Sequence, residues 1–410
     1  MFIKQLGRLL ILTSIPLHSF AAESYNLDQL VDVALNQNLS LKIEQEAITQ
    51  TELAKIDSDR LRWPSLSMNG STTNDLENQS GSLSINLNQP IYQGGSISVK
   101  QKQANLELRK TNINLNRKRQ SLKKDVQLAY IDILESLALE KEEKLSLTQL
   151  KEQARIANVM YSEGDVWKND VLQANVSIAQ GEAKVIAANN SVLLKKSALN
   201  ILLNFDLSNE INIEGKLEWR EYHWTWDNIK AHINSSHPEL NIAKINENIA
   251  DLSIKNQRSS KRPTVNMSSS VVHNEYFTSN IASSNDMTIS LSASWQLWDA
   301  GNINRNISNA RVEKKKKSIE LFNTRQIVLQ QAQQSWLKFK EAENQVSVLK
   351  QAIDIALENY RVNTVRYQEK LGTANDLLTA QTLLSKSKKD WISALARYLK
   401  SVYTLQYNLG

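Results

Sequence analysis

The sequence has no cysteine, and only five prolines and eleven glycines among 410 residues. Without cysteine, the chain cannot carry a disulfide scaffold, a thiolate metal site, a cysteine nucleophile or a lipid-modified N-terminal cysteine. Proline and glycine interrupt helices, at costs of about 3 and 1 kcal/mol, and both fall well below their usual share of a protein. The two longest proline-free runs, 91–237 and 264–410, have the same length. They permit very long helices and indicate one duplicated unit rather than several unlike domains.

Long hydrophobic runs are also missing. The first 21 residues place Lys4 and Arg8 before a short apolar core and end in small residues at Ser19 and Ala21, which is typical of a secretory signal peptide cleaved after Ala21. No later stretch reaches the length of a transmembrane helix, so the exported chain is either soluble or inserted as strands. The net charge of +6 is too small and too dispersed to indicate nucleic-acid binding.

Sequence motifs of catalysis are absent as well. There is no nucleophile elbow, HExxH, P-loop or dinucleotide-binding glycine motif. His223, His232 and His237 lie close together, but surface histidines are far commoner than zinc ligands, and their spacing does not indicate a site. We therefore predict no enzymatic activity, no cofactor and no metal.

The second half of the chain repeats the first. Matched residues of the two halves are separated by one constant number of positions up to Pro64 and Pro263. After these prolines the separation is again constant but seven residues larger. The slip falls where each half is least helical, which predicts a longer loop in the second copy. We divide the chain into a signal peptide, 1–21, and two repeats, 22–222 and 223–410. The matched pairs include Leu41 and Leu240, Pro64 and Pro263, Ala104 and Ala310, Tyr161 and Tyr367, and Asp170 and Asp376.

Each half begins with two helices and continues with two strands. The short amphipathic segments 27–36 and 226–235 precede helices that a proline stops after Arg62 and Arg262. Aliphatic residues then alternate with Ser and Asn, which predicts hairpins with loops at 72–80 and 273–286, the last strand reaching Leu297. Such alternation fits a barrel strand between lipid and water and a soluble antiparallel sheet equally well.

A sharp corner follows each hairpin. It consists of 89–95 in the first half and 295–301 in the second, where a proline or small residues end the strand before a helix. Tyr92 and Trp298 occupy the matched position, and each ring either lies at a membrane interface or packs under the corner. The residues that define the corners are Pro90, Tyr92, Gly94, Gly95, Trp298 and Gly301.

Long helices fill the rest of each half. We expect them at 96–160 and 302–366, followed by a glycine-containing reversal and returning helices at 170–204 and 376–408. The lysine run 314–317 points around most of its helix and favours a solvated face or a charge cluster at the barrel end over an anion site. A heptad-like spacing predicts a coiled-coil seam through Ala104, Leu108, Leu115, Leu122, Val126, Ala129 and Ile133.

Four strands in one chain are too few to close a membrane barrel, which needs about eight. An open sheet edge in lipid is prohibitive. If the strands enter a membrane, several chains must therefore pool them, two chains supplying eight strands and three supplying twelve.

The sequence resembles the TolC family of outer-membrane efflux and secretion channels. The resemblance covers 27–409 and rests on the duplicated order of elements, on the strand-end sequence 89–95, and on the turns around Gly164 and Gly372. It implies a fold that is mainly α with a β-barrel portion. Three chains would form a homotrimer with a twelve-stranded barrel and a tunnel of long helices, around which the short helices form a belt.

The resemblance also implies a function. The chain would be the outer-membrane channel-tunnel of a tripartite efflux or type I secretion system, in a Gram-negative bacterium with its helices in the periplasm. Its partners would be a periplasmic adaptor, an inner-membrane ABC or proton-driven transporter and outer-membrane lipid, with no nucleic acid. The residues alone leave one alternative, an exported coiled-coil scaffold or adhesion protein without a pore.

In this family the turns of the helical hairpins close the periplasmic entrance, with acidic side chains around the pore. The resemblance places Asp376 at one ring position and Thr379 at the second, where the family has another aspartate. It places Tyr367 and Asp170 at closing contacts and Gly372 where the family has a basic residue, for which Lys370 or Arg366 is the candidate substitute. From the residues alone, Asp170 and Asp376 are equally helix N-caps, and the two roles are compatible.

Overall fold

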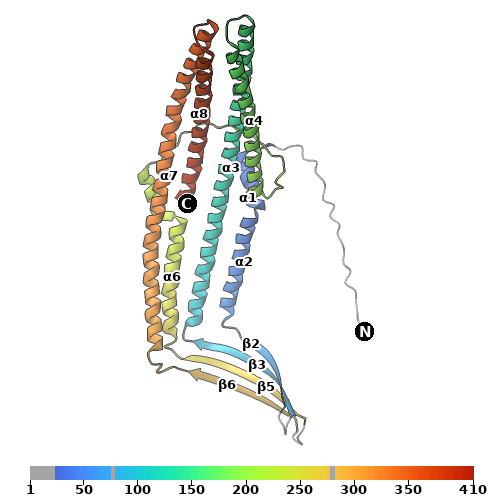
Figure 1. Ribbon diagram of the computed structural model, residues 1–410. Coiled ribbons are helices and arrows are strands. Elements are labelled where there is room, and N and C mark those ends of the chain that lie inside the picture. Colours follow the sequence, from blue (N-terminus) through green and yellow to red (C-terminus); the bar gives the residue numbers. More distant parts are fainter. Residues whose placement is uncertain (1–23, 75–78, 278–281) are drawn as a thin grey trace.

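The computed structural model describes residues 24–74, 79–277 and 282–410 (Figure 1). The predicted signal peptide, 1–21, lies outside them. The molecule is elongated, with helices running lengthwise and a curved sheet at one end (Figure 1). Among the described residues, no helix combines the length and apolar character that crossing a bilayer requires.

The two halves contain helices of matching length. In each half these are 11, 22, 67 and 36 residues long, which confirms the duplication and the predicted long helices. The first half contains α1 (Leu27–Gln37), α2 (Leu39–Arg60), α3 (Ser96–Ser162) and α4 (Lys168–Leu203), and the second contains α5 (Trp226–Ser236), α6 (Pro238–Ser259), α7 (Asn302–Gln368) and α8 (Ala374–Leu409).

Local sequence signals set most helix starts. Asn26 and Gln29 form a capping box at α1, and the Asn38 side chain caps α2. At the matched start of α6, the side chain of His237 accepts from the N–H of Glu239, and Pro238 occupies the first turn. Helices α2 and α6 end two or three residues before the predicted Arg62 and Arg262, because residues that precede a proline disfavour helical backbone.

The four main strands form one antiparallel sheet in the order β2-β3-β5-β6. Ser71 and Ser82 exchange a hydroxyl hydrogen bond of 2.8 Å across β2 and β3, and such pairs extend the ladder toward the hairpin ends. The predicted loops 72–80 and 273–286 were therefore too long. The strands are β2 (Ser65–Asn74), β3 (Gln79–Gln93), β5 (Thr264–Tyr276) and β6 (Ser284–Ser294).

The seven extra residues of the second half lie in two places, so the prediction of one longer loop was only partly right. The strands are connected by 75–78 in the first half and 277–283 in the second, and the last strand is separated from the long helix by 94–95 and 295–301. Strand β6 stops at Ser294 rather than Leu297 because its partner there, Thr264, is the first residue of β5. Pro263 precedes it and has no N–H to donate.

Pro90 lies within strand β3, not at its end as predicted. The pairing with β5 shifts between Pro90 and Tyr92, so that Ile91 is an extra residue in a bulge and the strand continues to Gln93. The helix corner follows at Gly94 and Gly95, which both have positive φ. A Cβ on Gly94 would lie 2.4 Å from the carbonyl oxygen of Ser259, so glycine is required there.

The sheet has one apolar and one polar face. The register places Met68, Ile85 and Val271 side by side on one face, in a row that continues to Met287. The opposite face is lined by Ser, Thr and Asn, whose side chains bond across strands. The only acidic residues in the four strands are Glu275 and Asp286, and there are no basic residues other than His273. Strands β2 and β6 form the two open edges (Figure 1).

The helical core lies midway along the molecule. Leu115, Leu122, Val126 and Ile133 of the predicted seam are buried, and the other three seam residues are half-buried. The sequence did not predict the cover of this core, an aromatic cluster in which Trp219 stacks on Tyr398 with ring centroids 4.2 Å apart. It also missed a two-stranded parallel sheet of β1 (Ser24–Tyr25) and β4 (Asn212–Ile213).

The lysine run on α7 lies among carboxylates. Lys314 is 2.6 Å from Asp251 on α6, and Lys317 is 2.8 Å from Glu320. Both lysines are therefore paired with carboxylates, which favours the predicted charged surface over an anion site.

Candidate functional site

The α3–α4 and α7–α8 hairpins end side by side, at the end of the molecule opposite to the sheet (Figure 1). Each long helix ends in a Schellman-type turn: Asp165 N–H donates to Met160 O in the first, and Leu371 N–H to Arg366 O in the second. The left-handed residue is Gly164 in the first turn but Lys370 in the second. Gly372 lies in the reversal, as expected, but it is not the left-handed residue that ends the second helix.

An apolar cluster joins the two hairpin tips. Met160 of α3, Tyr367 of α7 and Leu377 of α8 are buried against one another, with Ile156 and Val166 packed around them. Residues from both halves of the chain form this cluster, so separating the hairpins would expose it to water.

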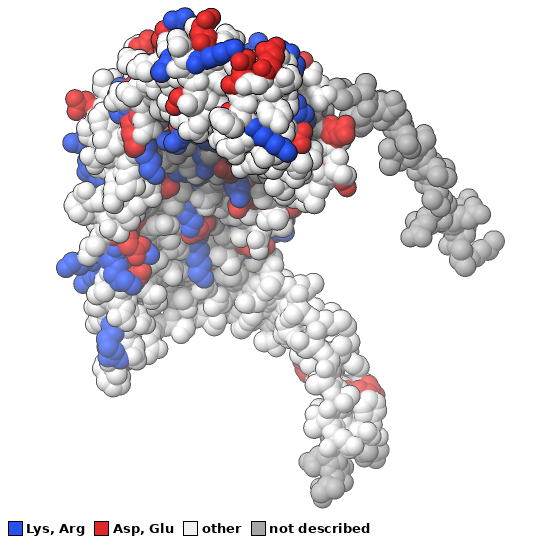
Figure 2. Space-filling model, turned by 45° about the horizontal axis from the view of Figure 1, so that its top comes forward, with Lys and Arg blue, Asp and Glu red and all other residues white. Residues whose placement is uncertain are grey.

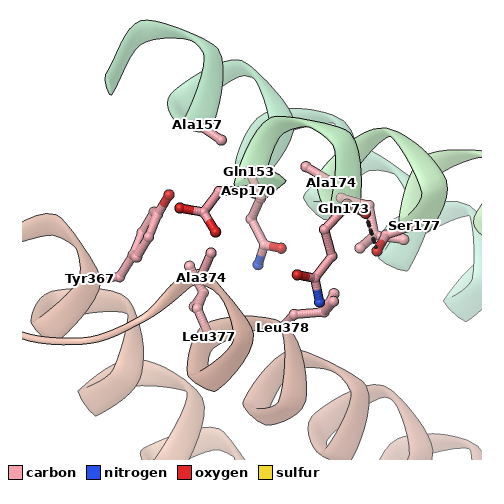
Figure 3. Close-up of a pocket in the computed structure, with 11 residues that line it drawn as sticks. Gln153, Ala157, Asp170, Gln173, Ala174, Ser177, Tyr367, Ala374, Leu377 and Leu378 are labelled. Carbon is pink, nitrogen blue, oxygen red and sulfur yellow. Dashed lines mark hydrogen bonds between the residues drawn. The ribbon is translucent and has the colours of Figure 1, made fainter. Parts of the chain in front are cut away.

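Tyr367 points toward Asp170 across a small cavity between the hairpins (Figure 3). The cavity has a volume of about 30 Å³, which is large enough to hold a water molecule. Within the described part of the chain, the buried Tyr367 hydroxyl has no hydrogen-bond partner. Burial, and secondly the charge of Asp170, raise the pKa of Tyr367 above its usual value. The structure thus places two residues that the resemblance assigns to closing contacts on one cavity, without a hydrogen bond between them.

The matched residues Asp170 and Asp376 are in different settings. Asp376 is the third residue of α8, and its carboxylate accepts from the N–H of Thr373 at 3.1 Å in a capping box. This hydrogen bonding to Thr373 lowers the pKa of Asp376. The position matching Thr373 is Trp167, which makes no side-chain cap. The sequence suggested that both aspartates are N-cap residues, but the N-cap positions are occupied by Trp167 and Thr373. Asp170 is directed at Tyr367.

One ion pair connects the turns directly. Lys370 Nζ lies 2.7 Å from an Asp165 carboxylate oxygen, and this contact raises the pKa of Lys370. A second link, from the Gln173 amide to Asn375 Oδ1, is longer at 3.4 Å. The sequence named Lys370 only as a substitute for the missing basic residue and did not identify Asp165, which carries no motif.

The other predicted residues of the tip lie outside these contacts. Thr379 is exposed on α8, one turn after Asp376. Gly372 is half-buried, and its N–H donates to Arg366 O at 3.0 Å. The corner residues Pro90, Tyr92, Gly94, Gly95, Trp298 and Gly301 lie at the far end of the molecule, where the sheet meets the long helices.

The chemistry available at the tips is that of a contact between two hairpins. Among the described residues, no group of His, Asp and Glu side chains is arranged to hold a metal ion. Lys, Arg, Asp and Glu are intermixed over this end (Figure 2). At the tips, apolar packing and the Lys370–Asp165 ion pair hold the hairpins together. Farther along α3 and α8, the ion pairs of Lys388 with Glu142 and of Lys389 with Glu143 do the same, and none of these contacts is covalent.

Comparison with known proteins decides the family. A sequence model of the outer membrane efflux protein family matches residues 30–204 and 232–410, which together make up most of the chain. The chain belongs to the outer membrane efflux protein family. It is an outer-membrane channel protein of efflux systems in Gram-negative bacteria, and members of this family are channels rather than enzymes. This confirms the resemblance inferred from the sequence and favours a channel over a poreless scaffold.

Solved outer-membrane channels share the fold at low sequence identity. The Vibrio cholerae protein VceC has a TM-score of 0.78 and 17% identity, covering 94% of this chain and 96% of its own. The Campylobacter jejuni CmeC channel has a TM-score of 0.80 and 15% identity, covering 94% of this chain and 85% of its own. The open state of the Neisseria gonorrhoeae MtrE channel has a TM-score of 0.78 and 17% identity, covering 93% of this chain and 88% of its own. A comparison with the curated proteins found no match.

Proposed function

We propose that three copies of this outer membrane efflux protein form one passive conduit through the outer membrane. The observation that carries the proposal is the four-stranded sheet with two open edges, one apolar face and one polar face. An apolar face suits lipid and a Ser/Thr/Asn face suits an aqueous lumen, but unpaired edges are not tolerated in a bilayer. Three sheets joined β6 to β2 remove every edge and give twelve strands.

The helices support the same assembly. In the half of the molecule next to the sheet, they lie in the order α2, α3, α6, α7, so α2 and α7 form the lateral edges (Figure 1). Both edges expose large apolar side chains, among them Ile43 on α2 and Phe322 on α7. A neighbouring copy would cover these side chains, as apolar patches on oligomer surfaces are covered.

The hairpin tips supply the closure of the proposed tunnel. Tyr367 and its buried cluster join the hairpins within one chain, and the Lys370–Asp165 ion pair replaces the basic contact that is missing at Gly372. Asp376 and Thr379 then contribute one carboxylate and one hydroxyl to the entrance, so that the ring carries less negative charge than two aspartates would give.

Opening would require a partner at the tips. Trp167 and Leu371 stand at the two turns with 85% and 74% of their surface exposed. Exposed apolar side chains of this size mark interaction sites, and we assign them to a periplasmic adaptor protein. An inner-membrane ABC or proton-driven transporter would supply the energy, and the channel itself would catalyse nothing.

Engineered cysteines test the assembly, because the natural chain contains none. Ser67→Cys on β2 is combined in turn with single cysteines along β6, and the purified outer membranes are oxidised. The expected product is a covalent ring of three chains at one or two of the β6 positions. Single-cysteine chains are the control. Links formed only within one chain, or a ladder that continues beyond three chains, would contradict the proposal.

A further inference from the structure

Large aromatic side chains gather where the sheet meets the helices. Trp63, Trp295 and Trp298 expose 66%, 60% and 81% of their surface, and Tyr92 is exposed on the apolar face beside them. The indole N–H of Trp295 donates to Lys261 O at 3.0 Å, which fixes that ring at the corner. Exposed Trp and Tyr beside an apolar face are typical of a membrane–water interface.

Basic residues surround the same corner. The segments 60–64, 89–95, 258–264 and 295–305 contain six basic residues and one acidic residue. All six are exposed, and within the described chain none of them forms an ion pair, whereas other helical lysines and arginines do. The six are Arg60, Arg62, Arg258, Lys261, Arg262 and Arg305.

The nearby carboxylates are occupied elsewhere. Asp299 accepts from the N–H groups of Gly301 at 3.0 Å and Ile303 at 2.5 Å, so it caps α7. Asp59, the residue before Arg60, pairs with Lys55 at 3.2 Å. Six cations without an ion pair in the described chain therefore lie beside a sheet that is almost free of charged side chains. The sheet's lack of charge is visible in Figure 2.

One cation lies directly on an aromatic ring: the Arg60 guanidinium is 5.8 Å from the centre of the Trp63 ring. This pairing places a positive group beside an interfacial indole. A phospholipid phosphate lies at the same depth of a bilayer as such a ring.

We propose that this corner is a binding site for anionic phospholipid headgroups of the periplasmic leaflet. The aromatic rings set its depth in the bilayer, and Arg60, Lys261 and Arg305 bind the headgroup phosphates. The proposal rests on the proposed function, because the sheet must be inserted for its helix-side rim to meet that leaflet. Pooling of strands would also place Trp63 of one chain near Trp295 and Trp298 of the next.

Brominated lipids test the site, because bromine on acyl chains quenches only tryptophans in contact with the bilayer. Of the nine tryptophans, only Trp63, Trp295 and Trp298 lie at the sheet. The full chain is reconstituted in phosphatidylcholine vesicles that contain brominated phosphatidylglycerol or brominated phosphatidylcholine. A basic group near an anionic surface strengthens binding by about fivefold, so quenching should show at least roughly that preference for phosphatidylglycerol. Raising salt to about 1 M should weaken the preference.

Three variants separate the site from total charge. Neutralising Arg60, Lys261 and Arg305 to Gln should lower the preference, and neutralising all six corner cations should bring it close to one. The matched control neutralises Lys151, Arg155 and Arg361, three paired cations near the hairpin tips, and should leave the preference unchanged.

Four results would overturn the proposal. The first two are equal quenching by the two lipids in the natural protein and a preference for phosphatidylglycerol that does not change with salt. The third is a preference that survives neutralisation of the corner cations. The fourth is a preference that inorganic phosphate abolishes and chloride of equal ionic strength does not, which would indicate a free-anion site. Absence of quenching by both lipids would instead contradict membrane insertion of the sheet, and with it the proposed channel.

Discussion

At the residue scale, one substitution between the repeats gives two matched aspartates different partners. Asp376 closes a capping box because Thr373 stands three residues before it, and Asp170 faces Tyr367 because the residue before it at that spacing is Trp167. A duplicated helix start has therefore diverged into a stable cap in one hairpin and an inter-hairpin contact in the other.

The capping box predicts an acid-sensitive helix start. The lowered pKa of Asp376 means that its stabilising contribution is present above the unfolded value of about 3.9 and is lost as pH falls through the folded value. Hydrogen exchange of the first amides of α8, corrected for the intrinsic pH dependence of exchange, should accelerate as the pH falls through the folded value. Thr373→Ala should accelerate it about fivefold at neutral pH, since a lost cap costs about 1 kcal/mol.

The equivalent change in the other hairpin is the control for this experiment. Trp167 makes no side-chain cap, so Trp167→Ala should leave exchange at the start of α4 unchanged. Equal acceleration in both hairpins would mean that capping does not distinguish them.

Tyr367 should hold the tips together through its ring rather than its hydroxyl. The hydroxyl is buried without a partner in the described chain, so Tyr367→Phe should leave the conductance of the closed channel in a planar bilayer unchanged. Tyr367→Ala removes a buried ring, at a cost of about 3 kcal/mol, and should raise that conductance. If Phe raised it as much as Ala, a hydroxyl contact with Asp170 would be the closing interaction.

At the element scale, the two hairpin turns are joined by an ion pair whose lysine has left-handed backbone. Lys370 takes the position that Gly164 occupies in the first turn, although lysine fits that conformation less well than glycine. The ion pair with Asp165 gives the turn a role that glycine cannot serve.

Breaking this ion pair should loosen the closed tips. Lys370→Ala and Asp165→Ala should each raise the basal conductance by roughly twofold to fivefold, a small effect because the lysine is mostly exposed. The double swap Asp165→Lys with Lys370→Asp should restore a low conductance. A swap that conducts as much as the single variants would exclude a direct ion pair.

Local periodicity predicted the elements better than their ends. Helices and strands follow from spacings within one segment, and these spacings occur twice. The end of β6 depends on Pro263, and the bulge at Ile91 depends on pairing with β5, so both required knowledge of how the halves meet. The same holds for the candidate site, where Asp165 and Lys370 become partners only after both hairpins have formed.

The exposed edge of α7 should be an assembly surface. Phe322 is 62% exposed, lines an open groove with Leu240 and Lys244 of α6, and belongs to neither buried cluster of the described residues. Phe322→Asp should therefore leave the fold intact. It would bury a charge in the assembly, which is costly, and should lower the trimer fraction at least roughly tenfold in size-exclusion chromatography. Phe322→Leu should preserve the trimer, whereas an undisturbed trimer in the Asp variant would place this edge outside the interface.

At the scale of the whole molecule, the sheet of one chain has the surfaces of a larger assembly. It has one apolar face, one polar face and two edge strands that pair with nothing further in the described residues. If the sheet enters a membrane, its strand count requires several chains, and the structure adds that β2 and β6 are the edges left to pair. The number of chains that join them is the central claim of this account.

Native mass spectrometry of the protein extracted from outer membranes in mild detergent measures that number directly. The account predicts a particle with the mass of three chains. It predicts no smaller stable particle, because only three sheets close the ring of twelve strands. A particle of two chains, or a monomer that remains inserted and conducts, would contradict it.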